Sequence, residues 1–140
     1  MTAKNQPESI KVNLGEKRSY PILIGKGWID SLGERLSPYF PARRCVLVTN
    51  PSIGRIWSDR VKTALQSHGY EIQRCEMREG EKNKTLTTVS MIYDLLVQNR
   101  HTRQSGLIAL GGGVVGDIGG FAASSFMRGI AYIQLPTSLL

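Results

Sequence analysis

The residues with the clearest chemical potential lie in a glycine-rich stretch, GLIALGGGVVGDIGGFAASSFMRG, at residues 106–129. Gly111, Gly113 and Gly116 have the spacing G-x-G-x-x-G, after an apolar run that predicts a strand and at the start of a predicted helix. Glycines there let backbone N–H groups approach pyrophosphate oxygens, and a helix N-terminus carries about half a positive charge. The stretch therefore predicts the phosphate-binding turn of a nucleotide site.

Two other interpretations fit part of this stretch. A membrane span has the length, but Asp117 at its centre would cost about 2.5 to 3.5 kcal/mol on insertion, and three consecutive glycines would break the helix. A purely structural helix explains the later glycines, which bring it close to a neighbour, but not Gly111, Gly112 and Gly113, which precede the predicted helix. A nucleotide site is favoured, although the acidic residue that usually binds the adenosine ribose some 20 positions further on is missing.

The elements that must position this turn follow from hydrophobic periodicity. Strands are predicted at 45–50, 70–77, 106–110 and 131–135, helices at 28–36, 53–65 and 85–99, and a β-hairpin at 10–14 and 19–24, with Pro21 in an edge or irregular strand. Alternating strands and helices predict one α/β domain over residues 1–140, with a Rossmann-like, mainly parallel sheet, helices on both faces and the hairpin in front. Ligands collect at the carboxyl ends of such strands, which points to the loops TNPSIG, EGEKNK and GGGVVGD.

The charge of the chain bears on its partners. Eighteen Lys and Arg against 11 Asp and Glu give a formal net charge of +7. The basic residues are scattered and do not interleave with aromatic residues, so we expect no nucleic acid partner, whereas a site for small anions suits the balance. The polar start MTAKNQPESI has no signal-peptide pattern, which predicts a cytoplasmic protein.

The cysteines and histidines do not have the spacing of a metal site. Cys45 and Cys75 fall inside predicted strands and are interpreted as inert, reduced core thiols. His68 and His101 lie near helix ends and are interpreted as surface residues. We therefore assign no metal ligand to this chain.

Several motifs taken in order, CVLVTN, GEKNK, GGGVVGDIGGFAA, the pair Arg128-Gly129 and IQLPTSLL, resemble the 3-dehydroquinate synthase family of sugar-phosphate cyclases over nearly the whole chain. The resemblance implies an NAD-binding amino-terminal domain of a homodimeric enzyme. It also implies a helical carboxy-terminal domain, absent from this chain, that holds a divalent metal, zinc or cobalt, and most of the substrate site. The family converts 3-deoxy-D-arabino-heptulosonate 7-phosphate into 3-dehydroquinate and phosphate in the shikimate pathway. We expect the 140-residue chain alone to be inactive.

The resemblance also assigns residues. Arg128 matches an arginine that binds the substrate phosphate across the dimer interface, and Asn50 matches a position near the adenosine. The residues implied to bind the cofactor are Asn50, Glu79, Gly80, Glu81, Lys82, Asn83, Lys84, Gly112, Gly113, Val114, Val115, Gly116, Asp117, Thr137 and Ser138. Met127 and Asn83 depart from the glutamine and the aromatic residue that are common in the family. No catalytic residue is assigned to this chain.

Other interpretations stay open. The chain could belong to a cyclase that makes an inosose or a valiolone, to a more distant glycerol-dehydrogenase-like enzyme, or to a non-catalytic NAD-binding module. Glu81, Lys82 and Lys84 could form a solvated loop, and Asn50 and Thr137 could cap helices. Asp117, placed in the first helical turn, could serve only to complement the helix dipole.

Overall fold

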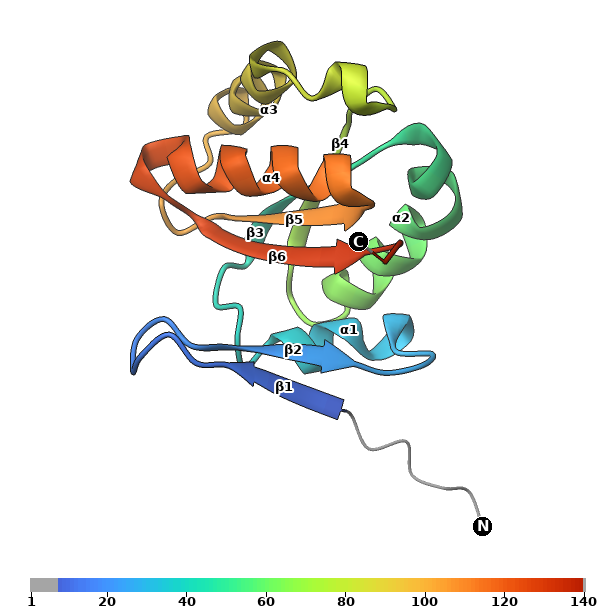
Figure 1. The fold of residues 1–140 in the computed structure, drawn as a ribbon, viewed down its shortest axis with the longest axis vertical. Helices are drawn as coiled ribbons and strands as arrows, with labels where there is room; N and C mark the ends of the chain where they lie inside the picture. The colour runs from blue at the N-terminus through green and yellow to red at the C-terminus, as the bar shows by residue number, and fades with distance from the viewer. Residues whose placement is uncertain (1–7, 140) are drawn as a thin grey trace.

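The strands form two separate sheets in the computed structural model, which describes residues 8–139 (Figure 1). Strands β1 (Glu8–Val12) and β2 (Tyr20–Ile24) pair antiparallel, with Ile10 opposite Ile22. This confirms the predicted hairpin, in which Pro21 is tolerated because each strand keeps a free edge. The stretch 1–7, which contains most of the polar start of the chain, lies outside the described residues, as does Leu140.

The main sheet is parallel throughout, in the order β4-β3-β5-β6. Its strands are β3 (Arg44–Thr49), β4 (Glu71–Glu76), β5 (Gly106–Gly111) and β6 (Ala131–Pro136). The chain steps outward from β3 to β4 and then returns past β3 to β5. Because strand order reverses there, a topological switch point lies between the carboxyl ends of β3 and β5.

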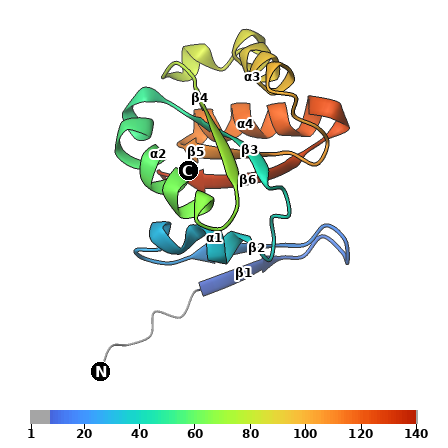
Figure 2. The same ribbon diagram turned by 180° about the vertical axis from the view of Figure 1, so that it is seen from behind.

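Helices cover both faces of this sheet, as Figures 1 and 2 show from opposite sides. The short turn η1 (Ile29–Ser31), α1 (Leu32–Leu36) and α2 (Pro51–Gln66) lie on one face. On the other face lie α3 (Leu86–Gln98) and α4 (Gly113–Ser125). Two further 3₁₀ turns, η2 (Glu81–Asn83) and η3 (Phe126–Arg128), follow β4 and α4. The predicted α/β architecture is confirmed.

Alternation along β3 divides the core into two layers. Val46 and Val48 join the cluster under α3 and α4, whereas Cys45 and Leu47 join the cluster under α1 and α2. Burying each large apolar side chain contributes about 1.5 to 3 kcal/mol. Both cysteines are buried as predicted, and burial raises the pKa of Cys45 to about 12 and that of Cys75 to about 11. Both thiols therefore stay protonated near neutral pH.

His101 is not the surface residue that its position near a helix end predicts. His68 is exposed, but only 3% of the His101 surface is accessible. The chain reverses after α3 at Arg100, whose φ is 55°, and the backbone N–H of His101 donates to the carbonyl of Leu96. This reversal carries the imidazole under the helix, where its Nε2 lies 2.8 Å from Oε1 of Gln73. A sequence pattern does not register a reversal of this kind.

Candidate nucleotide site

The carboxyl ends of the four parallel strands bring most of the predicted site residues to one edge of the sheet. In Figure 1 the arrowheads of β5 and β6 mark this edge. Helix α2 leaves from β3 on one face and α4 leaves from β5 on the other, so their N-termini diverge at the switch point. Crevices of this kind bind ligands in open α/β sheets.

The glycine-rich stretch is divided differently from the prediction. Gly111 is the last residue of β5, Gly112 is the N-cap, and α4 already begins at Gly113. Asp117 is therefore the fifth helical residue and lies beyond the first turn, where complementing the helix dipole is weaker. The helix starts early because Val115 and Ile118 are buried against the sheet, and this packing outweighs the low helix propensity of glycine.

The glycines of the turn are required for close approach. A Cβ added to Gly111 would lie 2.7 Å from Cγ2 of Val115, and one added to Gly112 would lie 3.0 Å from Oγ of Ser138. At Gly116 it would meet the side-chain amide of Gln134 at 2.4 Å. None of these glycines has a positive φ. At Gly111 and Gly116 the space of a Cβ is thus taken by the chain's own side chains, whereas at Gly112 only the end of the Ser138 side chain lies nearby.

Helices α2 and α3 have their N-termini occupied by side chains. In α2, Asn50 Oδ1 accepts from the N–H of Ile53 at 2.9 Å, and Glu79 Oε1 accepts from the N–H of Ser52 at 2.7 Å. The hydrogen bonds from Ser52 hold the pKa of Glu79 below its ordinary value. Thr85 caps α3 through the N–H of Thr88. The cap interpretation of Asn50 is thereby confirmed, which leaves its amide nitrogen as the group that could contact a ligand.

Helix α4 differs because no side chain caps it. Its N-cap is Gly112, so the first-turn N–H groups of Gly113, Val114 and Val115 are left for an external acceptor. Val115 is 1% exposed, so only its backbone could reach a ligand. Among these three long helices, α4 offers the open anion site.

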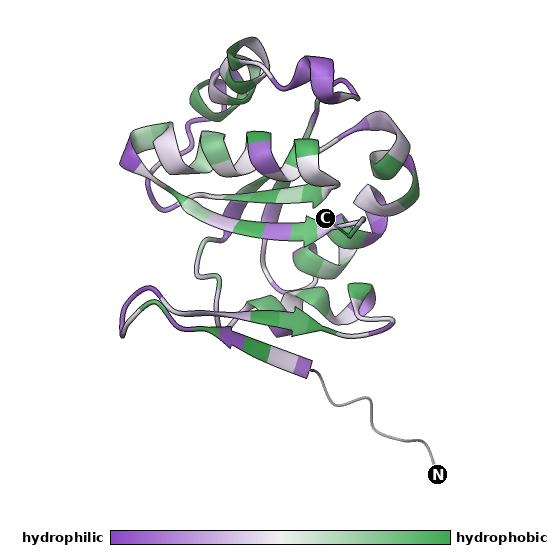
Figure 3. Ribbon diagram, in the orientation of Figure 1, coloured by the Kyte–Doolittle hydropathy of each residue, from purple (hydrophilic) through white to green (hydrophobic). Residues whose placement is uncertain are grey.

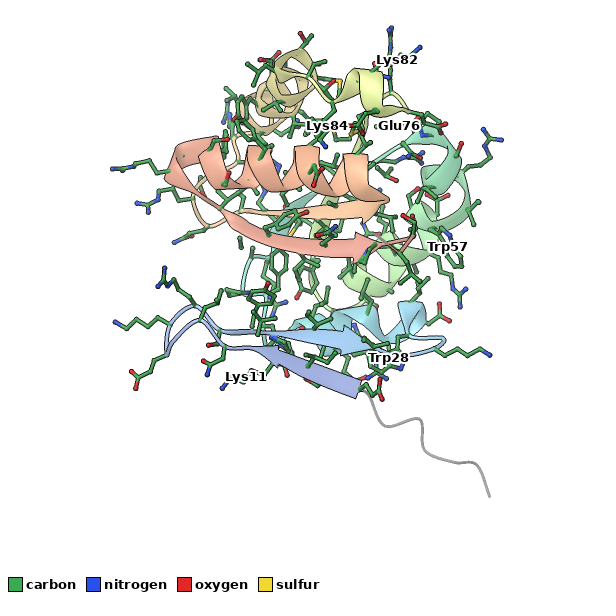
Figure 4. The ribbon with its side chains drawn as sticks, in the orientation of Figure 1. Lys11, Trp28, Trp57, Glu76, Lys82 and Lys84 are labelled. Carbon is green, nitrogen blue, oxygen red and sulfur yellow. The ribbon has the colours of Figure 1, made fainter. Side chains whose placement is uncertain are left out.

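An ion pair connects the loop after β4 to α4. Lys84 Nζ lies 2.6 Å from Oδ2 of Asp117 and 3.3 Å from Oε1 of Glu81. Asp117 first, and then Glu81, raise the pKa of Lys84 above its ordinary value. Lys82 extends outward from the loop, as Figure 4 shows, and fits the solvated-loop interpretation. Lys84 does not fit it, because its ion pair with Asp117 connects the loop to α4, whereas Glu81 is exposed and pairs only with Lys84 of the same loop.

The rest of this loop is shaped by its backbone. Gly80 has a φ of 95°, which favours glycine, and it leads into η2. The side-chain amide of Asn83 donates to the carbonyl of Glu79, and Thr88 Oγ1 donates to the carbonyl of Asn83 at 2.6 Å. Figure 3 shows that this segment is hydrophilic, whereas β5 beneath α4 is mostly hydrophobic. Asn83 therefore fixes the loop from within.

The residues after β6 contact the glycine turn directly. The N–H of Thr137 donates to the carbonyl of Gly111 at 3.0 Å, and Ser138 Oγ lies against Gly112. Within residues 8–139 no helix follows Thr137, so it caps none there. The Ser138 hydroxyl therefore lies beside the open end of α4, where it can supplement the free N–H groups.

Tyr132 is a site residue that the sequence did not suggest. From β6, its hydroxyl donates to the carbonyl of Gly116 at 2.8 Å. Burial, and then the negative charge of Asp117, raise the pKa of Tyr132 to about 12, so the hydroxyl keeps its proton. The Tyr132 ring lies against the bare backbone at Gly120, 3.5 Å from where a Cβ would be. Only the register of β6 beneath α4 reveals this contact.

Arg128 is the predicted residue that the structure does not bring to this edge. It lies in η3, which follows the C-terminal end of α4. The 13 residues of α4 span about 20 Å. A ligand in the crevice of this chain is therefore out of reach of Arg128 in the same chain.

The described residues contain neither a metal-binding cluster nor a helix that could span a membrane. Within residues 8–139, no three His, Cys, Asp or Glu side chains are arranged so that they could hold a metal ion. Over the same residues, every helix is too short or too polar to span a bilayer. The glycine-rich stretch is a strand, a helix and a turn, which removes the interpretation as one membrane helix.

The family model and the curated relatives agree on one family. Residues 74–140 match the family model described as the 3-dehydroquinate synthase N-terminal domain. A 3-dehydroquinate synthase of Clostridium beijerinckii is 42% identical over 133 residues, which cover 95% of this chain and 38% of that protein. The chain thus spans little more than a third of the length of the curated relatives it matches.

Solved structures agree on the fold. A 2-deoxy-scyllo-inosose synthase aligns with a TM-score of 0.83 at 21% identity, covering 94% of this chain and 36% of that one. A 2-epi-5-epi-valiolone synthase of Streptomyces hygroscopicus, solved with NAD⁺ and Zn²⁺ bound, aligns with a TM-score of 0.73 at 25% identity, covering 91% and 35%. The likeness covers about a third of each of these structures.

Proposed function

This chain belongs to the 3-dehydroquinate synthase family, and on that premise we propose that it is the NAD-binding amino-terminal domain, residues 1–140, of a 3-dehydroquinate synthase. The proposed reaction converts 3-deoxy-D-arabino-heptulosonate 7-phosphate into 3-dehydroquinate and phosphate, a step of the shikimate pathway toward aromatic amino acids. The observation that carries the proposal is the uncapped N-terminus of α4 at the switch point, beside Lys84 and Asp117.

The residues at this edge fit NAD⁺. The free N–H groups of α4 suit its pyrophosphate, and Gly112 leaves the space that a Cβ would fill next to Ser138. Asp117 can accept hydrogen bonds from ribose hydroxyls while Lys84 supplies a compensating positive charge. When bound, NAD⁺ takes up a hydride from a ring hydroxyl carbon of the substrate and later returns it. The chain's own part is to orient the dinucleotide.

The valiolone synthase solved with NAD⁺ supports this cofactor, and its Zn²⁺ supports a divalent metal, zinc or cobalt, in the complete enzyme. Among residues 8–139, no three His, Cys, Asp or Glu side chains are arranged so that they could hold that metal. We propose that the metal and most of the substrate site belong to the further length that the relatives have, and that this chain alone does not turn over substrate. The whole enzyme is proposed to be cytoplasmic, with a phosphorylated small-molecule substrate and neither nucleic acid nor membrane as a partner.

The position of Arg128 supports a homodimer. Its guanidinium is suited to a phosphate but lies at the far end of α4 from the crevice. We propose that it binds the substrate phosphate in the site of a second copy.

The test is phosphate release by the full-length protein supplied with 3-deoxy-D-arabino-heptulosonate 7-phosphate and NAD⁺. We expect phosphate to be released, and a chelator to stop the release. A full-length protein that binds NAD⁺ but leaves this substrate intact would contradict the proposed reaction. It would favour either another sugar-phosphate cyclase, which the likeness to the valiolone synthase supports, or a non-catalytic NAD-binding module.

A further inference from the structure

The turn that carries Arg128 has an unusual backbone. Met127 has φ 47° and ψ 34°, Arg128 has φ 67°, and Gly129 has φ 111°. Three consecutive residues thus occupy positive φ, and two of them have a Cβ. The left-handed region is unfavourable for such side chains, so this turn is strained.

Ending the helix does not require this strain. Helix α3 ends with one left-handed residue, Arg100, which is the ordinary way in which helices terminate. Helix α4 is followed by two left-handed side-chain-bearing residues before its glycine. Met127 is 46% exposed, so little apolar burial offsets its strain.

The flanks of the turn are firmly held. Phe126 is 7% exposed, and its ring stacks on Tyr93 with the centroids 6.2 Å apart. The Tyr93 hydroxyl also hydrogen bonds with Ser125 Oγ. On the other side, the N–H of Ile130 donates to the carbonyl of Ala123 at 2.8 Å, and that of Gly129 to Phe126 at 2.9 Å. These contacts hold the strained residues in place.

Because both flanks of the turn are fixed, few backbone conformations are open to the residues between them. A residue with a Cβ has a single small left-handed basin, whereas glycine has a wide range at positive φ. Between fixed flanks, Met127 therefore limits the turn to one conformation, and the next residue, Arg128, leaves the surface in one direction.

We propose that Met127 is a positioning residue, which keeps the exposed Arg128 directed toward an anionic group supplied from outside the chain. The inference rests on the proposed function, in which that group is the phosphate of a substrate bound to a second copy. Met127 itself touches neither substrate nor cofactor in this account. It acts by limiting the conformations of the turn.

The test uses three variants of the full-length enzyme. Met127→Gly should raise KM for the heptulosonate phosphate about tenfold, because small misplacements of a binding group are costly, and should leave kcat and NAD⁺ affinity nearly unchanged. Met127→Asn should keep KM near wild type, since asparagine accepts left-handed backbone and retains a Cβ. Arg100→Gly, at the left-handed end of α3, is the matched control and should change nothing.

A second readout does not depend on activity. Hydrogen exchange at the amides of Gly129 and Ile130 should be faster in Met127→Gly than in wild type and unchanged in Met127→Asn and Arg100→Gly. Equal exchange in Met127→Gly and wild type would overturn the inference, as would an equal KM. If the wild type releases no phosphate, the proposed reaction fails, and the exchange comparison still decides whether Met127 fixes the turn.

Discussion

Asp117 is the side chain through which α4 contacts the loop after β4, because it holds Lys84 Nζ at 2.6 Å. Replacing Asp117 by Asn removes the charged acceptor proposed for the ribose hydroxyls and releases Lys84. Hydrogen bonds to charged groups contribute about 1.5 to 3 kcal/mol, so NAD⁺ affinity of the full-length protein should fall by about 10- to 100-fold in calorimetry. Asp94→Asn, on the exposed surface of α3, is the control. Equal affinities in the two variants would remove Asp117 from the site.

His101 makes the stability of the fold depend on pH. Burial first, and then the nearby Arg44, lower the pKa of His101 below its ordinary 6.5, and its buried Nδ1 has no partner among the described residues. The unfolded chain therefore binds a proton at a higher pH than the folded chain. The contribution of neutral His101 to the free energy of unfolding should be fully present above about pH 6.5 and should be lost as the pH falls toward the folded pKa. The total loss is about 1.4 kcal/mol for each unit by which the folded pKa lies below the unfolded one.

Urea unfolding between pH 7.5 and 5 measures this dependence. His101→Gln should flatten the decline relative to wild type, whereas His68→Gln, at an exposed position, should retain it. The same pH slope in wild type and His101→Gln would show that another group causes the decline.

At the residue scale, the sequence predicted best where chemistry and spacing coincide. Gly112 and Asp117 were identified from their motif, and the structure places both at the carboxyl edge of the sheet. Their roles toward NAD⁺ stay predictions. His101 and Tyr132 were missed because burial and a hydrogen bond to a distant carbonyl depend on tertiary packing that periodicity does not encode.

Helix α4 packs one face closely against the sheet. Gly119 lies on that face, whereas the neighbouring Gly120 has more space around it. A Cβ at Gly119 would lie 3.0 Å from Cβ of Ala109 and 3.1 Å from Cδ2 of Leu107, whereas one at Gly120 would lie 3.5 Å from the Tyr132 ring. Gly119→Ala should destabilise the fold by about 1 to 3 kcal/mol through overpacking. Gly120→Ala should stabilise it by about 0.5 to 1 kcal/mol. Chemical denaturation that ranks the two variants the other way would contradict this packing.

At the element scale, the strands and helices of the sheet were predictable because their apolar periods are long and clear. The start of α4 was not predictable, because glycines disfavour a helix. The packing of Val115 and Ile118 against the sheet contributes more stabilisation than the glycines cost. The 3₁₀ turn in the loop 81–83 was also missed, since it is fixed by Asn83 and Thr88 rather than by periodicity.

The length of α4 separates the two proposed anion sites of the molecule. The crevice with its open helix end lies at one end, and Arg128 lies beyond the other. If Arg128 serves a second copy, Arg128→Ala should raise KM for the phosphorylated substrate by about 10- to 100-fold while NAD⁺ affinity stays unchanged. Arg103→Ala, another exposed arginine, is the control. Loss of NAD⁺ affinity with an unchanged KM would contradict the assignment.

The arrangement of the complete enzyme is the part that this sequence predicts least. Relatives are about two and a half times as long, and the substrate and metal sites are proposed to involve that further length. The fold class followed from alternating elements, and the family followed from ordered motifs, but neither gives the geometry of a second domain or of a partner subunit.

The open N-terminus of α4 is the proposed binding site for the pyrophosphate of NAD⁺. Gly112 has a φ of −80° that any residue can adopt, and the atom that an added Cβ would meet, Ser138 Oγ at 3.0 Å, is the end of a side chain that can rotate away. Gly112→Val should therefore keep the backbone while placing bulk beside the open helix end. Calorimetry on the full-length protein should show NAD⁺ binding by the wild type and by Gly120→Ala, and at least about tenfold weaker binding by Gly112→Val. Equal NAD⁺ affinity in Gly112→Val and wild type, or no binding by the wild type, would contradict the account.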